Sequence, residues 1–182
     1  MEKRFLGKNA VITGGAGGIA LATCNSLLAQ GAKVTLLDID LDTTNKKIES
    51  FGWSSDSVKA IYCNVIDSLS VEAAYKKSNA WMGSIDILVT CAGGYSKYQD
   101  FENTSEEDWD KIIALNLKSV FLCSKAVIPY MKERSWGRIV NIGSLAGRSA
   151  ITGTSPVAYG SAKAAVSMLT QYLAKDIAQY NI

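Results

Sequence analysis

The sequence predicts an α/β fold, in which a doubly wound parallel sheet carries helices on both faces. Short apolar runs alternate along the chain with longer amphipathic stretches, a pattern typical of βαβ units. Several runs lack polar alternation, as expected for strands that are buried on both faces. A glycine cluster follows the first run directly and precedes the first amphipathic stretch, which indicates the order strand, tight turn, helix.

The alternation defines five strands and five helices. The predicted strands are residues 10–13, 33–37, 58–63, 85–91 and 138–142. The predicted helices are residues 18–30, 43–51, 68–82, 105–131 and 157–180. Thr104 and Glu107 have the spacing of a capping box at the start of the fourth helix. Right-handed crossovers place the first strand centrally and the ligand site at the carboxyl ends of the strands. We expect one domain over residues 1–182.

Composition and charge exclude several classes of protein. The chain is 48% hydrophobic and 20% charged, as is usual for a globular protein, and its net charge of +2 favours neither nucleic acid nor an anionic membrane. No apolar run reaches about 18 residues, and the N-terminus lacks the apolar region of a signal peptide. We therefore expect a cytoplasmic protein with no nucleic-acid partner and no membrane partner.

Cysteine and histidine usage narrows the chemistry further. Cys24, Cys63, Cys91 and Cys123 are widely spaced in apolar surroundings, so we expect four buried free thiols, a reducing compartment and no metal site. The chain contains no histidine. This excludes Ser-His-Asp hydrolysis, Cys-His proteolysis and histidine-ligated metals. Acid–base chemistry must then use Tyr, Lys, Asp, Glu or Cys.

The glycine cluster at residues 14–18 predicts a phosphate-binding turn. The first N–H groups of a helix lack internal partners, and glycines let a pyrophosphate approach the backbone closely. A purely structural turn is the alternative. Three overlapping spacings are present: Gly15-x-Gly17-x-x-Ala20, Thr13-Gly14-x-x-x-Gly18 and Thr13-Gly14-x-x-Gly17-x-x-Ala20.

An acidic residue at the end of the second strand predicts the type of dinucleotide. Asp38 follows Gly14 by 24 residues, close to the spacing at which a carboxylate meets the adenosine ribose. Such a carboxylate would repel a 2′-phosphate, and Ala16, Gly17 and Ile39 offer no basic group to receive one, so the sequence favours NAD over NADP. Alternatively, Asp38 is a solvated or helix-capping charge, a role that Asp40 and Asp42 could serve equally well.

A second cluster, Ser144 with Tyr159 and Lys163, predicts proton transfer. Tyr159 and Lys163 are four residues apart and share one face of the last predicted helix. A lysine ammonium about 4 Å from a phenol, at an effective dielectric near 20, favours the phenolate by about 4 kcal/mol. Ser144 follows the fifth strand and so lies at the binding edge of the sheet, where its hydroxyl could hold a substrate oxygen.

The ordered set of motifs resembles the short-chain dehydrogenase/reductase family, in its typical single-domain branch with a Rossmann-like fold. The residues that carry the resemblance are Thr13, Gly14, Gly18, Ile19, Asp38, Asn64, Val65, Ala92, Gly93, Asn116, Ser144, Tyr159 and Lys163. The third glycine spacing also resembles the extended, epimerase-like branch, whereas the stretches around Ala92 and Asn116 fit the typical branch better.

The resemblance implies a cofactor site and a proton relay. Tyr159 would be the general acid in reduction and the base in oxidation, and Lys163 would favour the phenolate and bond the nicotinamide ribose. Ser144 would orient the carbonyl or hydroxyl, and Asn116 would hold a water that connects Lys163 to solvent. The cofactor-binding residues so implied are Gly14, Gly17, Gly18, Ile19, Asp38, Asn64, Val65, Ala92, Gly93, Tyr159 and Lys163.

The chain departs from the family pattern at several positions. Ala20 replaces the last glycine of the turn, and Asn64 replaces an aspartate, which keeps an acceptor for the adenine amine but loses the charge. Cys91 replaces an asparagine, so we expect weaker bracing of the strands there. The 14 residues between Ser144 and Tyr159 predict a bulged loop.

The resemblance also implies a C-terminally incomplete fold. Relatives continue beyond the equivalent of Tyr180, so we expect a sheet without the last two strands, completed by a longer protein or by self-association. In relatives, the helices that carry Asn116 and Tyr159 form a four-helix bundle, and a homodimer or homotetramer is expected. The residues compatible with this bundle, or equally with a core, are Val120, Leu122, Ala126, Ala164, Ala165 and Met168.

The implied function is an NAD-dependent oxidoreductase that interconverts a secondary alcohol and a ketone, with a small-molecule substrate. Two alternatives stand beside it: a catalytically incompetent dinucleotide-binding fragment, and an epimerase or dehydratase with tightly held NAD. The loops at residues 94–101 and 145–156 are expected to line the substrate site. Tyr95 and Tyr98 in the first loop indicate an apolar or ring-bearing substrate.

Overall fold

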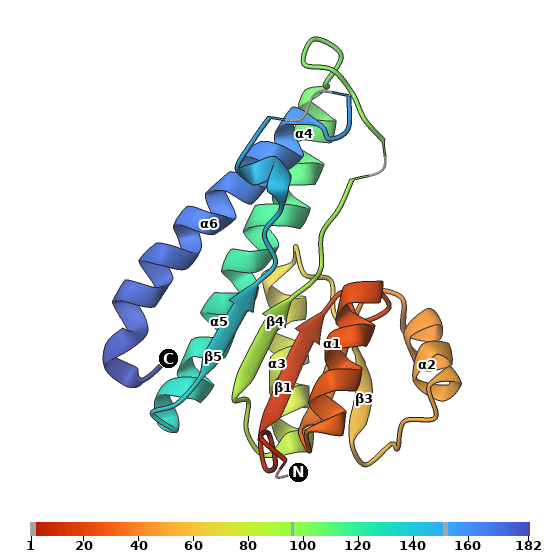
Figure 1. The fold of residues 1–182 in the computed structure, drawn as a ribbon, viewed down its shortest axis with the longest axis vertical. Coiled ribbons are helices and arrows are strands. Elements are labelled where there is room, and N and C mark those ends of the chain that lie inside the picture. The colour runs from red at the N-terminus through yellow and green to blue at the C-terminus, as the bar shows by residue number, and fades with distance from the viewer. Residues whose placement is uncertain (1–2, 96, 151–152) are drawn as a thin grey trace.

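The computed structural model describes residues 3–95, 97–150 and 153–182, and these form one parallel sheet in the strand order β3-β2-β1-β4-β5 (Figure 1). The strands are β1 (Asn9–Thr13), β2 (Lys33–Asp38), β3 (Val58–Tyr62), β4 (Ile87–Thr90) and β5 (Arg138–Asn141). The predicted central position of the first strand is confirmed. Each predicted strand is present, with ends that differ by one or two residues.

The register of the sheet brings the ends of the strands level. Thr13 at the end of β1 lies opposite Leu37 of β2 and Thr90 of β4, and Thr90 lies opposite Asn141 of β5. The side chains of Thr90 and Asn141 also join, since the Thr90 hydroxyl donates to Asn141 Oδ1 at 2.9 Å. This bond braces β4 against β5 beside Cys91. The sheet therefore presents one edge at which the residues after β1, β2, β4 and β5 meet.

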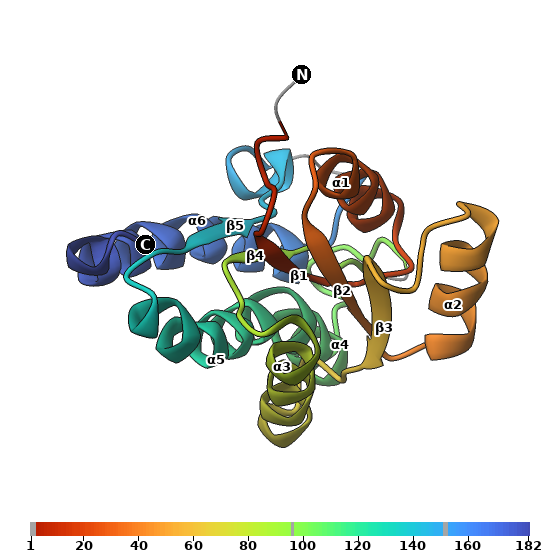
Figure 2. The same ribbon diagram turned by 90° about the horizontal axis from the view of Figure 1, so that it is seen from below.

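Helices cover both faces of the sheet, which confirms the doubly wound prediction (Figure 2). On one face lies α1 (Gly18–Ala29), with α2 (Leu41–Ser50) beside the edge strand β3. On the other face lie α3 (Ser68–Met82) and α5 (Ser119–Glu133). Strand residues alternate between the two cores: Ala10 belongs to the α1 core and Val11 to the α3–α5 core. This alternation follows from the two-residue period of a strand.

The C-terminal half adds a long helical run and a second helix beside it. The run consists of α4 (Glu106–Ile113), a π-helical turn (Ala114–Lys118) and then α5. The last helix, α6 (Val157–Ile177), packs against α4 and the π turn and ends in a 3₁₀ turn (Ala178–Tyr180). A further 3₁₀ turn (Leu145–Gly147) lies between β5 and α6. In Figure 1 the loops that precede α4 and α6 both lie at the top of the view, at the carboxyl end of the sheet.

The predicted cap of the fourth helix is wrong by one residue. Ser105, not Thr104, accepts a hydrogen bond from the Asp108 N–H, at 3.1 Å. The Thr104 hydroxyl instead donates to the Asp100 carbonyl at 2.8 Å. The pairing of Thr104 with Glu107 is therefore not used, because the helix begins one residue later than the capping-box pattern requires. The predicted single α-helix is also interrupted by the π turn.

The helical run Glu106–Glu133 is long and apolar enough, by length and composition, to cross a membrane. Its buried residues Cys123, Val127 and Met131 belong to the core beneath the sheet. Asn116, at its π turn, is a buried polar residue with hydrogen bonds to the loop after β4. These residues are packed inside the protein, and 33% of the apolar 18-residue window is buried.

Several residues that the sequence left between core and interface are now placed. Val120 lies in the core with 1% of its surface exposed, whereas Met168 on α6 is 53% exposed. Cys24, Cys63 and Cys123 are buried free thiols, as predicted, and burial raises the pKa of Cys24 and Cys123 to about 12. The prediction is wrong for Cys91, which is only half-buried because it lies beyond the end of β4, at the open edge of the sheet.

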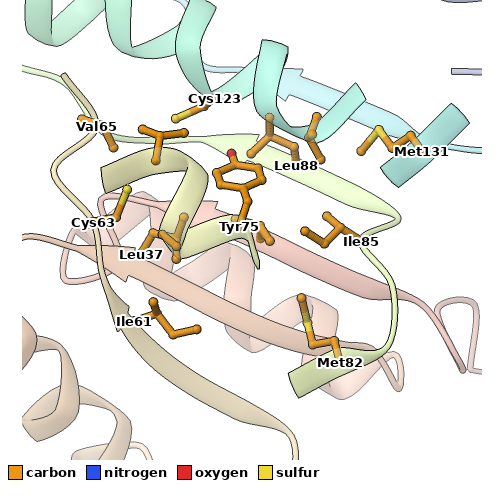
Figure 3. Packing of buried hydrophobic residues seen from close by; sticks show 14 residues of the cluster. Leu37, Ile61, Cys63, Val65, Tyr75, Met82, Ile85, Leu88, Cys123 and Met131 are labelled. Carbon is orange, nitrogen blue, oxygen red and sulfur yellow. The ribbon is translucent and has the colours of Figure 1, made fainter. Parts of the chain in front are cut away.

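The Tyr75 hydroxyl is a polar group within the α3–α5 core. The Tyr75 side chain is fully buried, and Figure 3 shows its hydroxyl between Cys123 and Leu88. This hydroxyl has no hydrogen-bond partner of good geometry among the described residues. Burial, and secondarily the Cys123 thiol, raises the pKa of Tyr75 well above its ordinary value. The hydroxyl is thus desolvated without compensation.

Replacing Tyr75 by Phe should leave the free energy of unfolding unchanged or raise it by up to about 1 kcal/mol, since an unpaired buried hydroxyl is removed. Urea unfolding followed by tryptophan fluorescence measures this change. Tyr130→Phe, at a half-buried residue packed against the same core, is the control and should be neutral. A loss of more than about 1 kcal/mol in Tyr75→Phe would show that the hydroxyl is paired.

Candidate active site

The glycine turn between β1 and α1 is shaped by close backbone contacts. Gly14 has φ +67°, and a Cβ at this position would lie 2.9 Å from the Ala92 backbone. A Cβ on Gly15 would lie 2.8 Å from the Leu36 Cβ on β2. The turn therefore lies directly against the neighbouring strands, and any side chain at either position would push it away.

Gly18 differs from these two glycines. A Cβ on Gly18, the first residue of α1, would meet nothing within 4 Å. No side chain caps the N-terminus of this helix, whose N-cap residue is Gly17. Free N–H groups with open space in front of them are what an anionic group needs at a helix N-terminus.

Asp38 connects the glycine turn to the end of β2. Its Oδ2 accepts from the Ala16 N–H and its Oδ1 from the Asp40 N–H, each at 3.0 Å. The helix-capping role belongs to Asp40, whose side chain accepts from the Thr43 N–H at 2.9 Å. Asp38 is therefore not a helix cap, and its carboxylate lines a cavity instead.

A cavity of about 390 Å³ opens next to this turn. Six of the predicted cofactor residues line it, and these are Gly14, Asp38, Asn64, Val65, Ala92 and Gly93. Asn64 is held at the end of β3, where its Oδ1 accepts from the Ile66 N–H at 3.3 Å and its N–H donates to Ser70. Ala92 is held by its N–H, which donates to the Thr13 hydroxyl at 3.1 Å. Gly17, Gly18 and Ile19 are not among the lining residues.

Gly93 is where the cavity meets the predicted catalytic residues. A Cβ on Gly93 would lie 2.8 Å from Asn116 Oδ1 and 3.5 Å from Lys163 Nζ. The backbone of the β4–α4 loop at Gly93 thus lies close to both side chains. Only a glycine fits there, because Gly93 also has φ +157°.

Asn116 is a fully buried residue of the π turn, and its amide holds the loop after β4. Its Oδ1 accepts from the Gly94 N–H, and its Nδ2 donates to the Gly94 carbonyl, both at 2.8 Å. The second Nδ2 proton goes to the Ile112 carbonyl at 2.9 Å. Single π turns inside α-helices are frequent at functional sites. Here the turn presents one amide to both backbone groups of Gly94.

Lys163 is a buried lysine, with 5% of its surface exposed. Its Nζ donates to the Ile142 carbonyl at 2.8 Å and lies 5.8 Å from the centroid of the Tyr159 ring. Burial lowers the pKa of Lys163, and the Cys91 thiol opposes that shift in part. Burial raises the pKa of Cys91 to about 11, which keeps this thiol protonated beside the ammonium at neutral pH.

Ser144 and Tyr159 complete the set. The Ser144 Oγ accepts from the Ala146 N–H at 3.2 Å, a bond that leaves its hydroxyl proton available. The half-buried Tyr159 packs its ring against Tyr95 in an edge-to-face contact, with centroids 4.8 Å apart. The predicted bulge between Ser144 and Tyr159 begins as a 3₁₀ turn. Part of this loop, residues 151–152, lies outside the described residues.

Sequence reasoning missed two glycines that set this geometry. A Cβ on Gly147 would lie 2.6 Å from the Ala164 N and the Lys163 carbonyl carbon. A Cβ on Gly160 would lie 3.0 Å from the Ala146 carbonyl oxygen. The 3₁₀ turn that follows Ser144 therefore lies directly on α6, the helix that carries Tyr159. Nothing in the sequence sets these two glycines apart, because the contacts that require them join the turn to α6.

Comparison with known proteins finds a matching family model and relatives that are named dehydrogenases and reductases. A family model described as short chain dehydrogenase matches residues 8–182. The 2,3-dihydro-2,3-dihydroxybenzoate dehydrogenase of Bacillus subtilis is 35% identical over 99% of this chain and 68% of its own length. The 5-keto-D-gluconate 5-reductase of Escherichia coli K12 is 34% identical over 97% of this chain and 68% of its own length.

Solved structures agree with these relatives. A structure of NAD⁺-bound xylitol dehydrogenase superposes with a TM-score of 0.93 at 30% identity, covering 99% of this chain and 68% of that one. The relatives are named dehydrogenases and reductases, and the shared fold is Rossmann-like. The motifs by which the sequence resembles a family include the glycine turn, Asp38 and the pair Tyr159 and Lys163. The chain is a member of the short-chain dehydrogenase/reductase family, whose members are oxidoreductases that use a nicotinamide dinucleotide.

Proposed function

We propose that this chain binds NAD(H) in preference to NADP(H) and interconverts a small secondary alcohol and a ketone, with Tyr159 as the acid–base group. The observation that carries the proposal is the meeting at Gly93 of the cavity containing Asp38 with the buried pair Asn116 and Lys163. The names of the relatives, dehydrogenases and a reductase, support the reaction class.

The residues fit a dinucleotide. The open space in front of Gly18 and the uncapped start of α1 suit a pyrophosphate. Each Asp38 oxygen accepts one backbone N–H, which leaves lone pairs for ribose hydroxyls, and a second phosphate at that point would be repelled. Asn64 and Val65 line the same cavity and would flank the adenine. The nicotinamide ring, when bound, supplies or accepts the hydride.

The protein's own part of the reaction is proton transfer and positioning. Tyr159 would give its phenolic proton to the substrate oxygen in reduction and take it back in oxidation. Ser144 would donate its hydroxyl proton to the same oxygen, since its Oγ already accepts from Ala146. The Lys163 ammonium, held by the Ile142 carbonyl, would stabilise negative charge on the phenol.

Asn116 would serve this site through the backbone that it holds. Both Nδ2 protons and one Oδ1 lone pair are used in bonds to Gly94 and Ile112. The proposed water between Lys163 and solvent must then bind the second Oδ1 lone pair or the Asn116 backbone carbonyl.

Two alternative functions make different predictions. A binding-only fragment predicts dinucleotide binding without turnover. An epimerase or dehydratase with tightly held NAD predicts no net release of NADH.

We further propose that the chain is cytoplasmic and self-associates as a homodimer or homotetramer. Four free cysteines support a reducing compartment. Apolar side chains at the surface of α6 and α5 support self-association: Met168 is 53%, Tyr172 65% and Phe121 47% exposed. Ala164 is also exposed on α6.

Coenzyme preference should depend on Asp38. Titration with NADH or NADPH, followed by energy transfer from tryptophan, should give tighter binding of NADH. Asp38→Asn should reduce this preference by about tenfold or more, because the charge that repels a 2′-phosphate is removed. Asp42→Asn removes the same charge four residues away and should leave the ratio unchanged. Equal preference in the wild type and Asp38→Asn would contradict the assignment.

Gly18→Ala should weaken NADH binding by about tenfold or more without lowering Tm, because the added methyl fills only the space proposed for the pyrophosphate. Gly14→Ala is the contrasting variant. Its methyl would meet the Ala92 backbone at positive φ, at a cost of about 1–3 kcal/mol in stability. Unchanged NADH affinity in Gly18→Ala would place the phosphates elsewhere.

Tyr159→Phe should lower the rate of turnover with secondary alcohols and NAD by about a hundredfold or more, while NADH binding persists. Absorbance of NADH at 340 nm measures turnover, and the titration above measures binding. Tyr172→Phe, on the exposed part of α6, is the control and should retain activity. Turnover that survives in Tyr159→Phe would refute the proton-transfer role.

A further inference from the structure

Tyr95 joins the two loops that lie above the sheet edge. Its hydroxyl donates to the Thr154 carbonyl at 2.7 Å, across 59 residues of sequence. Its ring meets the Tyr159 ring edge-to-face, with centroids 4.8 Å apart and an interplanar angle of 61°. The β4–α4 loop is thereby tied to the β5–α6 loop directly beside the proposed acid–base group.

The position of Tyr95 is set from its N-terminal side as well. The preceding residue, Gly94, has both its N–H and its carbonyl bonded to the Asn116 amide. Gly94 also has φ +136°, a conformation that favours glycine. Asn116 is buried in the π turn, so the start of the Tyr95 backbone is anchored to the helix core. The side chain is then held at both ends, by Gly94 and by Thr154.

Solvent exposure does not explain why Tyr95 lies against Tyr159. Tyr98 is in the same loop and is 42% exposed, close to the 40% of Tyr95. Among the described residues, however, the Tyr98 side chain has no ring contact and no hydrogen bond. The two tyrosines have the same chemistry and similar exposure, and they differ in contact with Tyr159. Tyr98 instead lines a cavity of about 560 Å³ between the two loops. Tyr62, at the end of β3, is 49% exposed and lies outside both loops, so it serves as the control.

We propose that Tyr95 is a positioning and specificity-determining residue, whose ring forms one wall beside the Tyr159 phenol and limits the size of the substituent that a substrate can carry there. The selectivity part of this inference rests on the proposed function. An aromatic ring tethered through its hydroxyl loses little freedom on binding and presents a fixed apolar surface. A substituent placed where the Tyr95 ring lies would have to displace the ring and break the bond to Thr154.

The first experiment tests the wall without requiring turnover. Tyr159 in the intact chain is nitrated with tetranitromethane, and the modified peptide is quantified by mass spectrometry. Tyr95→Ala should raise the initial rate of Tyr159 nitration severalfold, because the ring that shields it is gone. Tyr62→Ala should match the wild type. Equal rates in Tyr95→Ala and the wild type would overturn the proposed wall.

The second experiment tests selectivity by the ratio of kcat/KM for 1-phenylethanol to that for 2-propanol, a ratio that cancels losses of active protein. Tyr95→Ala should raise this ratio by about tenfold or more, chiefly through a lower KM for the larger alcohol. Tyr95→Phe keeps the ring but not the Thr154 bond and should give an intermediate ratio. Tyr62→Ala, outside both loops, should leave the ratio unchanged.

The outcomes separate the two proposals. If the wild type and all variants bind NADH but turn over neither alcohol, the proposed function is refuted, and the selectivity role of Tyr95 is refuted with it. If the wild type is active and Tyr95→Ala changes neither the nitration rate nor the ratio, Tyr95 alone is refuted. A change in the ratio that Tyr62→Ala reproduces would show that the change does not come from the Tyr95 ring and would overturn the role of Tyr95.

Discussion

The parallel pairing of β1 with both β2 and β4 is the constraint on which the candidate site depends. It brings the ends of three strands level, and short hydrogen bonds then join the segments that follow them. The Gly15 N–H donates to the Leu37 carbonyl, the Ala16 N–H to Asp38, and the Ala92 N–H to the Thr13 hydroxyl. The cavity exists because these backbone segments are tied to one another, with glycines where a Cβ would separate them. A shift of one residue in register would move Asp38 away from the turn and turn its side chain to the other face of the sheet.

The second half of the site is arranged around groups that are costly to bury. Asn116 occupies a π turn, a rare geometry, and Lys163 carries an ammonium into a buried position that lowers its pKa. Hydrogen bonds to backbone carbonyls offset the cost of burying each group. The Asn116 amide donates to the carbonyls of Gly94 and Ile112, and the Lys163 ammonium donates to that of Ile142. The Gly94 and Ile142 carbonyls belong to the segments after β4 and β5 that approach the proposed substrate position, and the Ile112 carbonyl belongs to α4. The loops and the buried polar groups therefore hold one another in place, and a change in either would disturb the proton-transfer group Tyr159.

Two pairs of chemically equivalent residues show where local patterns stop being informative. Asp38 and Asp40 were equal candidates for a helix cap, and Thr104 and Ser105 are both capable N-caps. The structure separates them by hydrogen bonds: Asp40 caps α2 and Ser105 caps α4. Asp38 does not cap the helix, because the parallel register places it against the glycine turn. Which of two like residues acts as the cap depends on where the backbone turns, and spacing alone leaves that open by one or two residues.

The sequence by itself determined the order of strands and helices, the glycine turn, and the candidate pair Tyr159 and Lys163. These follow from periodicity, glycine chemistry and helical spacing, all of which act over a few residues. Only the tertiary structure decided the π turn, the bonding of Asn116 to both backbone groups of Gly94 and the placing of Tyr95 against Tyr159. These contacts join residues 22 and 64 positions apart. They depend on how separate elements pack, because a buried amide or ring finds its partner only after the sheet and helices have brought distant backbone segments together.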